Sequence, residues 1–213
     1  MNNVETRDLL LCSLAAADLD DVASVHQAAF PKSILTKLGK EAVCRYYGWL
    51  LEGPHEIYAL GVRQEGKLAG FCFGGIAPTA MSGFLRRNKA LLTRKLAARP
   101  WLIADPLFRD RFKRAFQALS RRAVTFAAAS PGAPKRPFDV LSIAVRPDVQ
   151  GGGIGKRLMA GAETTALRNG FHVMTLMVHT DNRQAIDFYL AIGWEKLLMK
   201  GVWRGNMEKW LNR

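Results

Sequence analysis

One stretch, residues 139–155, constrains the fold of this chain more than any other. Its first part is rich in aliphatic and β-branched residues and is typical of a buried strand. Pro147 cannot donate a hydrogen bond to a neighbouring strand, so we expect the strand to stop before it. Four glycines follow within positions 151–155, and a helical pattern of apolar residues begins at Ile154. Such a junction directs backbone N–H groups and the positive end of a helix dipole at an anion.

Two common phosphate-binding loops do not fit these glycines. A P-loop would have glycine at position 150 and serine or threonine at position 157, whereas the chain has Gln150 and Arg157. A dinucleotide fingerprint would have a third glycine at position 156 or 158, where the chain has Lys156 and Leu158. Both kinds of site are therefore excluded.

The pattern that remains is Gln150-x-x-Gly153-x-Gly155 after a strand that ends Val145-x-Pro147. It resembles the acyl-CoA pyrophosphate loop of the GNAT N-acetyltransferase superfamily. A second stretch further along the chain is similar to another signature of that superfamily, in the expected order and separation: Asn182, Ala185, Tyr189, Gly193 and Trp194. The resemblance implies an α/β fold with a mixed central β-sheet that is flanked by helices and splayed beside the cofactor.

The same resemblance implies a function. It predicts an enzyme that transfers an acyl group, acetyl in the first instance, from acyl-CoA to a primary amine by direct attack. The loop backbone would cradle the pyrophosphate, and the strand before it would receive the pantetheine arm and the thioester carbonyl. The expected acetyl-CoA-binding residues are Ile143, Ala144, Val145, Gln150, Gly151, Gly152, Gly153, Ile154, Gly155, Lys156, Asn182 and Tyr189.

Two of these residues have more than one interpretation. Tyr189 is the candidate general acid, because the matching tyrosine lies near the sulfur in many members of the superfamily; the alternative is a packing tyrosine with a satisfied hydroxyl. Asn182 lies seven residues earlier, on the same helix face. It would hydrogen-bond the pantetheine arm, cap the helix, or do both.

The general base has several candidates. Asp139 lies eleven residues before Gln150, a spacing at which some members of the superfamily carry a catalytic carboxylate. A strand-edge acid in solvent is the alternative. His179 is a second candidate base, His55 and Glu56 are weaker ones, and a water chain could replace any single base.

Charged residues are unevenly distributed along the chain. Its 213 residues suit a single domain over 1–213, with a net charge of +13. Residues 78–137 hold 14 basic and 2 acidic side chains, and their apolar positions recur at helical spacing. We therefore expect a basic helical insertion within the domain, at residues 78–137.

The insertion has three interpretations. It is a solvated helical cover, a site for an acidic acceptor such as a nucleotide-linked amino sugar, or an interfacial membrane patch. The membrane interpretation rests on apolar residues that alternate with Arg and Lys, namely Trp101, Leu102, Ile103, Phe108, Phe112 and Phe116. Nucleic-acid binding has no motif behind it. The amine acceptor is open between an amino sugar and a protein or peptide, and a non-catalytic acyl-CoA-binding module is the alternative to an enzyme.

Composition also bears on location. The apolar run Leu9–Leu11 is too short for a signal peptide or a membrane span. The three cysteines are odd in number and have no C-x-x-C spacing, which predicts reduced thiols. We expect a protein of the cytoplasm, free or peripheral at the membrane, that binds no metal.

The spacing of apolar residues and the positions of glycine, proline and capping residues predict the other elements. We expect helices around residues 22–30, 33–51, 154–169 and 182–192. Strands are expected at residues 7–14, 56–63, 67–75, 171–179 and 194–203, with the strand at 171–179 covered on both faces because it is apolar throughout.

Overall fold

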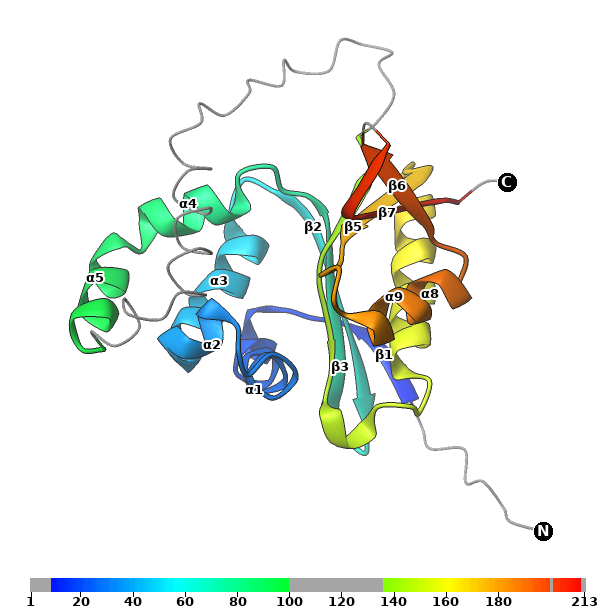
Figure 1. Cartoon of the computed structure of the whole chain (residues 1–213). Helices are drawn as coiled ribbons and strands as arrows, with labels where there is room; N and C mark the ends of the chain where they lie inside the picture. The colour runs from blue at the N-terminus through cyan, green and yellow to red at the C-terminus, as the bar shows by residue number, and fades with distance from the viewer. Residues whose placement is uncertain (1–8, 100–135, 200, 212–213) are drawn as a thin grey trace. The chain divides into compact units, whose positions relative to one another are not determined.

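The computed structural model describes residues 9–99, 136–199 and 201–211 (Figure 1). The chain divides into two compact units. Unit 1 comprises residues 1–14, 56–76 and 135–213 and contains the sheet. Unit 2 comprises residues 15–55 and 77–134 and is helical where it is described.

The sheet of unit 1 has seven strands in the order β1-β2-β3-β4-β5-β7-β6. Every neighbouring pair is antiparallel except β4 and β5, which are parallel. The predicted mixed sheet is therefore confirmed. The strands are β1 (Leu9–Ser13), β2 (Glu56–Gln64), β3 (Lys67–Ile76), β4 (Phe138–Val145), β5 (Val173–Met177), β6 (Glu195–Met199) and β7 (Val202–Trp210).

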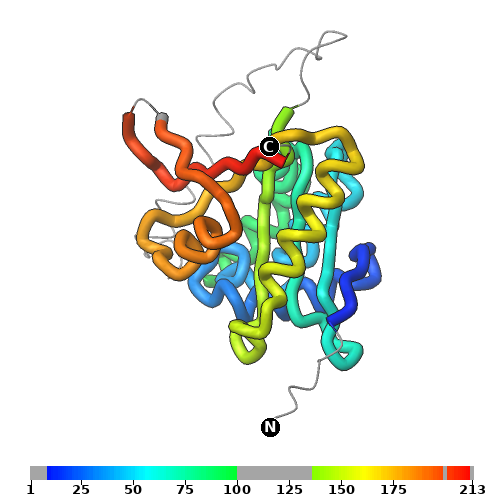
Figure 2. Tube along the Cα trace, turned by 90° about the vertical axis from the view of Figure 1, so that its right-hand side faces the viewer, coloured from blue at the N-terminus to red at the C-terminus, as the bar shows by residue number. Residues whose placement is uncertain are grey.

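Two helices belong to unit 1, α8 (Ile154–Arg168) and α9 (Arg183–Ala191). Helix α8 runs along one face of the sheet and packs against β1 to β4 (Figure 2). The helical pattern of apolar residues expected from Ile154 onward is present, and its Ile154, Leu158 and Ala162 are buried in this contact. Gly161 permits the close approach, because a Cβ there would lie 2.8 Å from Leu11 Cδ2. The helix that follows the glycine loop is thus fixed by the core.

The described part of unit 2 contains α1 (Leu19–Ala29), α2 (Ile34–Leu38), α3 (Lys40–Glu52), α4 (Ala80–Arg87) and α5 (Lys89–Ala97). Its interior includes Tyr47, whose hydroxyl lies 2.9 Å from His26 Nδ1. Ser33 Oγ lies 3.0 Å from His26 Nε2. Burial lowers the pKa of His26 to about 4, so the imidazole is neutral at physiological pH.

Three of the expected elements were wrong in detail. The single helix over 33–51 is two helices, because Gly39 adopts φ +98° between them. The last strand over 194–203 is a hairpin of β6 and β7 that turns at Gly201, where φ is +77°. The strand expected at 171–179 is not covered on both faces, because Met177 is 75% exposed.

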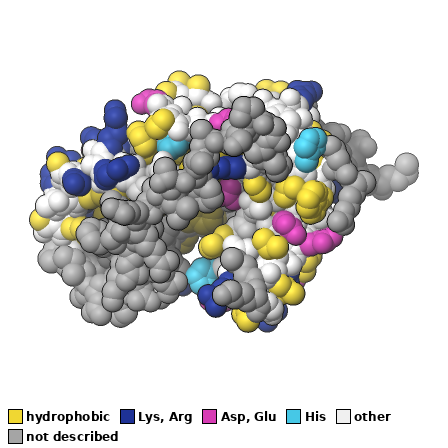
Figure 3. Space-filling model, turned by 90° about the horizontal axis from the view of Figure 1, so that it is seen from above, with side chains coloured by type: hydrophobic (Ala, Val, Ile, Leu, Met, Phe, Trp, Pro, Cys, Tyr) yellow, Lys and Arg dark blue, Asp and Glu magenta, His cyan; other side chains and the backbone are white. Residues whose placement is uncertain are grey.

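The basic segment is helical where it is described, as α4 and α5 show. The apolar residues behind the membrane interpretation, Trp101 to Phe116, lie outside the described residues. Lys and Arg side chains gather on the part of unit 2 that carries α4 and α5 (Figure 3, left). None of the described helices is both long enough and apolar enough to cross a bilayer.

Candidate active site

The glycine loop follows a strand that separates from its neighbour. Strands β4 and β5 pair over only three positions, Phe138 to Val140, although β4 continues to Val145. The β3–β4 register shifts opposite Phe73 and Gly74, which leaves Leu141 as an extra residue in β4. Beyond this bulge, no described strand pairs with the β5 side of β4. The predicted splay is present, and it leaves backbone groups of β4 available to a ligand.

The loop itself has the backbone conformation that glycine favours. After the 3-10 turn Pro147–Val149, Gly151 has φ +83° and Gly153 has φ +80°. A Cβ at either position would meet no atom within 4 Å, so open space lies beside both. Gln150 Nε2 donates a hydrogen bond of 3.1 Å to Val145 O, which ties the loop to the end of β4.

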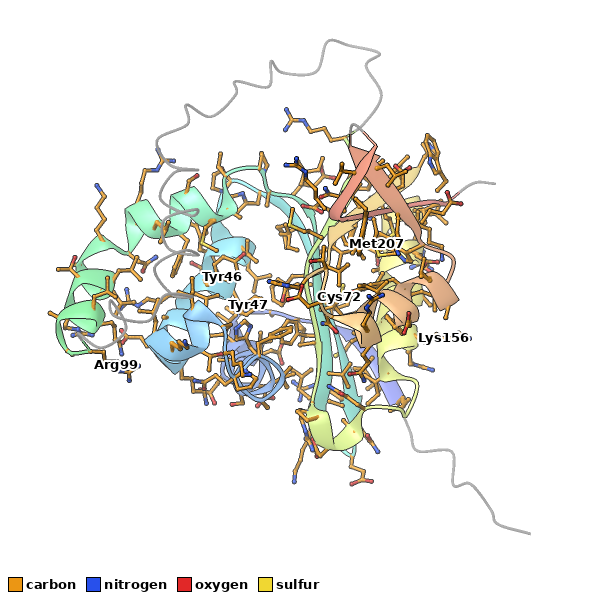
Figure 4. The ribbon with its side chains drawn as sticks, viewed as in Figure 1. Tyr46, Tyr47, Cys72, Arg99, Lys156 and Met207 are labelled. Carbon is orange, nitrogen blue, oxygen red and sulfur yellow. The ribbon has the colours of Figure 1, made fainter. Side chains whose placement is uncertain are left out.

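Helix α8 begins without a side-chain cap, because its N-cap residue is Gly153. Helices α2 and α9, in contrast, are capped by Ser33 and Asn182. The first turn of α8 holds no acidic residue, and Lys156 is exposed there (Figure 4). Cations at this end oppose the helix dipole, whereas an anion would satisfy both the dipole and the free N–H groups. The loop residues therefore fit the pyrophosphate of an acyl-CoA.

Tyr189 lies on α9 and is 7% exposed. Its ring centre is 5.2 Å from that of Phe188 and 5.8 Å from that of Trp194. Within the described part of the chain its hydroxyl forms no hydrogen bond, which argues against a tyrosine whose hydroxyl is satisfied by the fold. Burial, and to a lesser extent the thiol of Cys72, raises the pKa of Tyr189 above its ordinary value. The phenol is therefore protonated at neutral pH.

Cys72 comes from β3, at the middle of the sheet (Figure 4). The residue is fully buried, and burial raises the pKa of its thiol to about 12. A thiol that stays protonated is a poor nucleophile. Cys72 therefore acts on the site as a packing group beside Tyr189, a neighbour that the sequence did not reveal.

Asn182 caps α9. Its side-chain oxygen accepts a hydrogen bond of 3.1 Å from Ala185 N, so the capping role is confirmed. The side chain is exposed, and its NH2 group has no partner among the described residues. A contact from this NH2 group to pantetheine stays a prediction.

Replacing Asn182 by serine would separate the two roles. Serine keeps an oxygen that can cap the helix but lacks the amide donor. We expect Asn182→Ser to leave the melting temperature nearly unchanged and to raise the KM for acetyl-CoA several-fold. Asn182→Ala, which also removes the cap, should cost about 0.5–2 kcal/mol of stability. An unchanged KM in the serine variant would reduce Asn182 to a helix cap.

Asp139 lies on β4 at the point where β4 and β5 still pair. Its Oδ1 accepts a hydrogen bond of 3.2 Å from Thr175 Oγ1. The side chain remains accessible to solvent. Desolvation by the surrounding protein nevertheless raises the pKa of its carboxyl, against the Thr175 hydrogen bond, which lowers it. A carboxylate with a raised pKa is a better proton acceptor than an ordinary aspartate.

Asp139 belongs to a row of paired residues across four strands. Thr175 on β5 pairs with Asp139 and with Glu208 on β7, and Glu208 pairs with Glu195 on β6. Paired residues on neighbouring strands project to the same face. Three carboxylates thus share this face of the sheet. The sequence did not predict the row. Residues 194–203 were expected to form one strand, so the pairing of β7 with β5 and β6 was not foreseen.

The other candidate bases lie in different surroundings. His179 Nδ1 is 3.3 Å from Asp181 Oδ2, and its side chain is largely exposed. His55 belongs to unit 2, whereas the glycine loop belongs to unit 1. Burial lowers the pKa of His55. Glu56 accepts a hydrogen bond of 3.0 Å from the Tyr58 hydroxyl. In the described ranges, no group of three or more His, Cys, Asp or Glu side chains could hold a metal ion.

A family model described as "Acetyltransferase (GNAT) family" matches residues 19–194. The sequence matches none of the curated proteins. The fold matches PaiA N-acetyltransferase from Thermoplasma acidophilum in complex with coenzyme A, with 17% identity and a TM-score of 0.57, over 95% of this chain and 99% of that chain.

Two further solved structures share the fold. One is the ribosomal-protein-S18-alanine N-acetyltransferase from Escherichia coli, with 14% identity and a TM-score of 0.53, over 94% of this chain and 90% of that one. The other contains the glucosamine N-acetyltransferase region of a fungal multi-domain GH3 β-N-acetylglucosaminidase. It has 15% identity and a TM-score of 0.57, over 92% of this chain and 18% of that one.

Proposed function

The chain belongs to the GNAT family of acetyltransferases, and from that premise we propose that it transfers the acetyl group of acetyl-CoA to a primary amine of a small molecule. The observation that carries the proposal is the junction of β4 and α8. There β4 separates from β5 and leads into α8, whose N-terminus has no side-chain cap. Between them, Gly151 and Gly153 have a left-handed backbone conformation and open space beside them. This combination supplies a cradle for the donor's pyrophosphate and, for its pantetheine arm, an edge of β4 along which β5 no longer pairs.

Acetyl-CoA supplies an acetyl group held as a thioester. In the transfer, a C–N bond forms and the C–S bond breaks. The amine loses one proton and the leaving sulfur gains one. We assign the donated proton to Tyr189 Oη, because this phenol is protonated and free of other hydrogen bonds within the described residues. We assign the proton taken from the amine to the carboxylate of Asp139.

The acidic row supports an amine as the acceptor. Most primary amines are cationic in water, and the carboxylates of Asp139, Glu208 and Glu195 would attract such a cation. A cationic amine must first lose one proton, to water or to a nearby base, to become a nucleophile, and the second proton, lost during the transfer, is the one assigned to Asp139. An amino sugar, free or nucleotide-linked, is the acceptor class we propose. Solved structures with this fold include a glucosamine N-acetyltransferase region and a ribosomal-protein-S18-alanine N-acetyltransferase, so peptides belong in the same test.

We predict that Asp139→Asn lowers kcat by about 10²–10⁴-fold, the usual contribution of one acid–base group. Asp139 works as a base only when ionised, and its pKa is raised. In the wild type, kcat should therefore rise with pH through a value above that of an ordinary aspartate, and the asparagine variant should lack this limb. The matched control is Glu208→Gln in the same row, which should raise the acceptor KM and leave kcat unchanged. Equal effects of the two variants on kcat would refute the assignment.

The proposal is tested by an acceptor screen. Purified protein is incubated with acetyl-CoA and amino sugars, nucleotide-linked amino sugars, polyamines or short peptides, and free CoA thiol is measured. Release that depends on an amino sugar supports the proposal. Release with peptides alone would make the protein a peptide N-acetyltransferase. Binding of acetyl-CoA without release for any amine would favour a non-catalytic module.

The distribution of cysteines fits a reducing compartment. Cys12, Cys44 and Cys72 are all free thiols, and none is placed in a C-x-x-C pair. We propose the cytoplasm as the place where the protein acts.

A further inference from the structure

A groove of about 410 Å³ opens in unit 2, which is not the unit that contains the glycine loop. Its volume lies in the range of small-molecule sites. One wall is a face of α3, and the other is the junction of α4 and α5. The lining residues are Leu19, Cys44, Arg45, Gly48, Trp49, Glu52, Arg87 and Asn88.

Two glycines shape this groove. On α3, Tyr47 faces the interior of unit 2 (Figure 4), whereas Gly48 presents no side chain to the groove. A Cβ at Gly48 would lie 3.3 Å from Leu19 Cδ1 and would narrow the floor. Gly83 on α4 packs directly on the indole of Trp49, where a Cβ would lie 2.4 Å from Cζ2. The groove is thus held open by close packing around it.

The indole of Trp49 is a fixed wall. Its Nε1 donates a hydrogen bond of 2.9 Å to Ala80 O, at the start of α4. The guanidinium carbon of Arg87 lies 5.8 Å from the centre of the indole ring. Such cation–π contact orients a guanidinium without using its N–H donors. Among the described residues, no carboxylate pairs with Arg87, so its donors remain available.

Arg45 is oriented from the other side. Its Nη1 donates to Asn88 Oδ1 over 3.4 Å, and its Nη2 donates to Glu41 Oε1 over 3.2 Å. Asn88 is 6% exposed, and its Nδ2 donates to Phe84 O over 3.0 Å, which fixes its amide. A guanidinium has five N–H donors, so Arg45 keeps some free. The lining contains two guanidinium groups, those of Arg45 and Arg87, and one carboxylate, that of Glu52, so its net charge is positive.

We propose that this groove binds a phosphate monoester of a small organic molecule, with the phosphate against Arg87 and Arg45 and the organic part against Trp49. The planar donor fork of arginine matches the oxygens of phosphate, and two such forks suit a dianion better than a single carboxylate group. Trp49 and Leu19 provide the apolar surface that a bare inorganic ion would not need.

The probe is phenyl phosphate, which combines a dianion with a flat ring. Protein with ¹⁵N-labelled tryptophan shows one indole signal for each of its 5 tryptophans, and Trp49→Phe identifies the signal of Trp49. Titration at constant ionic strength in phosphate-free buffer is expected to shift that signal saturably. Phenol, benzoate and inorganic phosphate should each bind more weakly, since each lacks the dianion or the ring.

The matched variants are Arg87→Gln and Arg86→Gln, neighbours on α4 of which only Arg87 lines the groove. Both side chains are exposed, so both variants should fold, as thermal melting would check. We expect Arg87→Gln to weaken phenyl phosphate binding about tenfold or more, because a hydrogen bond to a charged group exceeds the 1.4 kcal/mol of one factor of ten. Arg86→Gln should change it less than twofold.

Three results would overturn the proposal. The first is an unmoved Trp49 signal at saturating probe. The second is an equal loss in Arg86→Gln and Arg87→Gln, which would mean general attraction to a basic surface. The third is benzoate binding as tightly as phenyl phosphate, which would make the groove a carboxylate site.

Discussion

Replacing Gly153 by glutamate is expected to abolish acetyl-CoA binding in a protein that still folds. Gly153 is the N-cap of α8 and has φ +80°, and open space lies where a Cβ would stand. A side chain there costs about 1–2 kcal/mol in backbone strain. Its carboxylate would occupy the space of the pyrophosphate, repel it and compete for the same helix N–H groups. Calorimetric titration with acetyl-CoA measures the loss directly.

The chain offers a matched control at the other end of the same helix. Gly170 follows α8, has φ +74° and also faces open space. Gly170→Glu adds the same charge and a similar strain, so it should lower stability comparably and keep the acetyl-CoA affinity. Unchanged affinity in a folded Gly153→Glu variant would contradict the assignment of the loop.

Replacing Tyr189 by phenylalanine is expected to lower kcat by about 10²–10⁴-fold, with acetyl-CoA affinity and stability nearly unchanged. The ring contacts with Phe188 and Trp194 are kept. The lost hydroxyl has no hydrogen-bond partner among the described residues, so the fold loses little. Because the pKa of Tyr189 is raised, the wild type should show no loss of kcat from its ionisation as the pH rises through neutrality.

The control for this variant is Tyr58→Phe in the same unit. Its hydroxyl already donates to Glu56 over 3.0 Å, so its removal tests the general effect of losing a phenol. Tyr58→Phe should leave kcat unchanged. A loss of less than about threefold in Tyr189→Phe would favour a packing role, since that is far below the usual effect of an acid–base group.

The sequence correctly predicted the elements that depend mainly on the properties of neighbouring residues in the chain. The strand, glycine loop and helix over residues 139–168 follow from β-branched residues, glycines and one apolar stripe, and all are present. The strands expected at residues 56–63 and 67–75 are also present, as the hairpin of β2 and β3, which turns at Glu65 and Gly66. The break between α2 and α3 at Gly39 was not predicted from the sequence. Helices continue through many glycines, and only packing against neighbouring residues selects a positive φ at this one.

Long-range pairing could not be read from the sequence. The acidic row exists only because β7 inserts between β5 and β6, which places Glu208 beside Thr175. A solvated helical cover would leave the basic residues of α5 facing outward, and an acceptor site would leave them lining its entrance. The Arg94 side chain is 71% exposed and that of Lys95 is 23% exposed, and both pair with Glu41 on α3, at 3.5 and 3.1 Å. The sequence did not reveal this pairing. This pairing, with the Lys95 hydrogen bond as its largest part, lowers the pKa of Glu41. Such contacts depend on how helices pack, which local periodicity does not specify.

The most direct measurement is the stoichiometry of one reaction, followed with the best acceptor from the screen. Free CoA thiol and acetylated amine are quantified together over time. We expect one acetylated amine for each thiol released, with no release in the absence of the amine and none from Gly153→Glu at the same acetyl-CoA concentration. Thiol release that is independent of the amine, or undiminished in Gly153→Glu, would contradict this expectation.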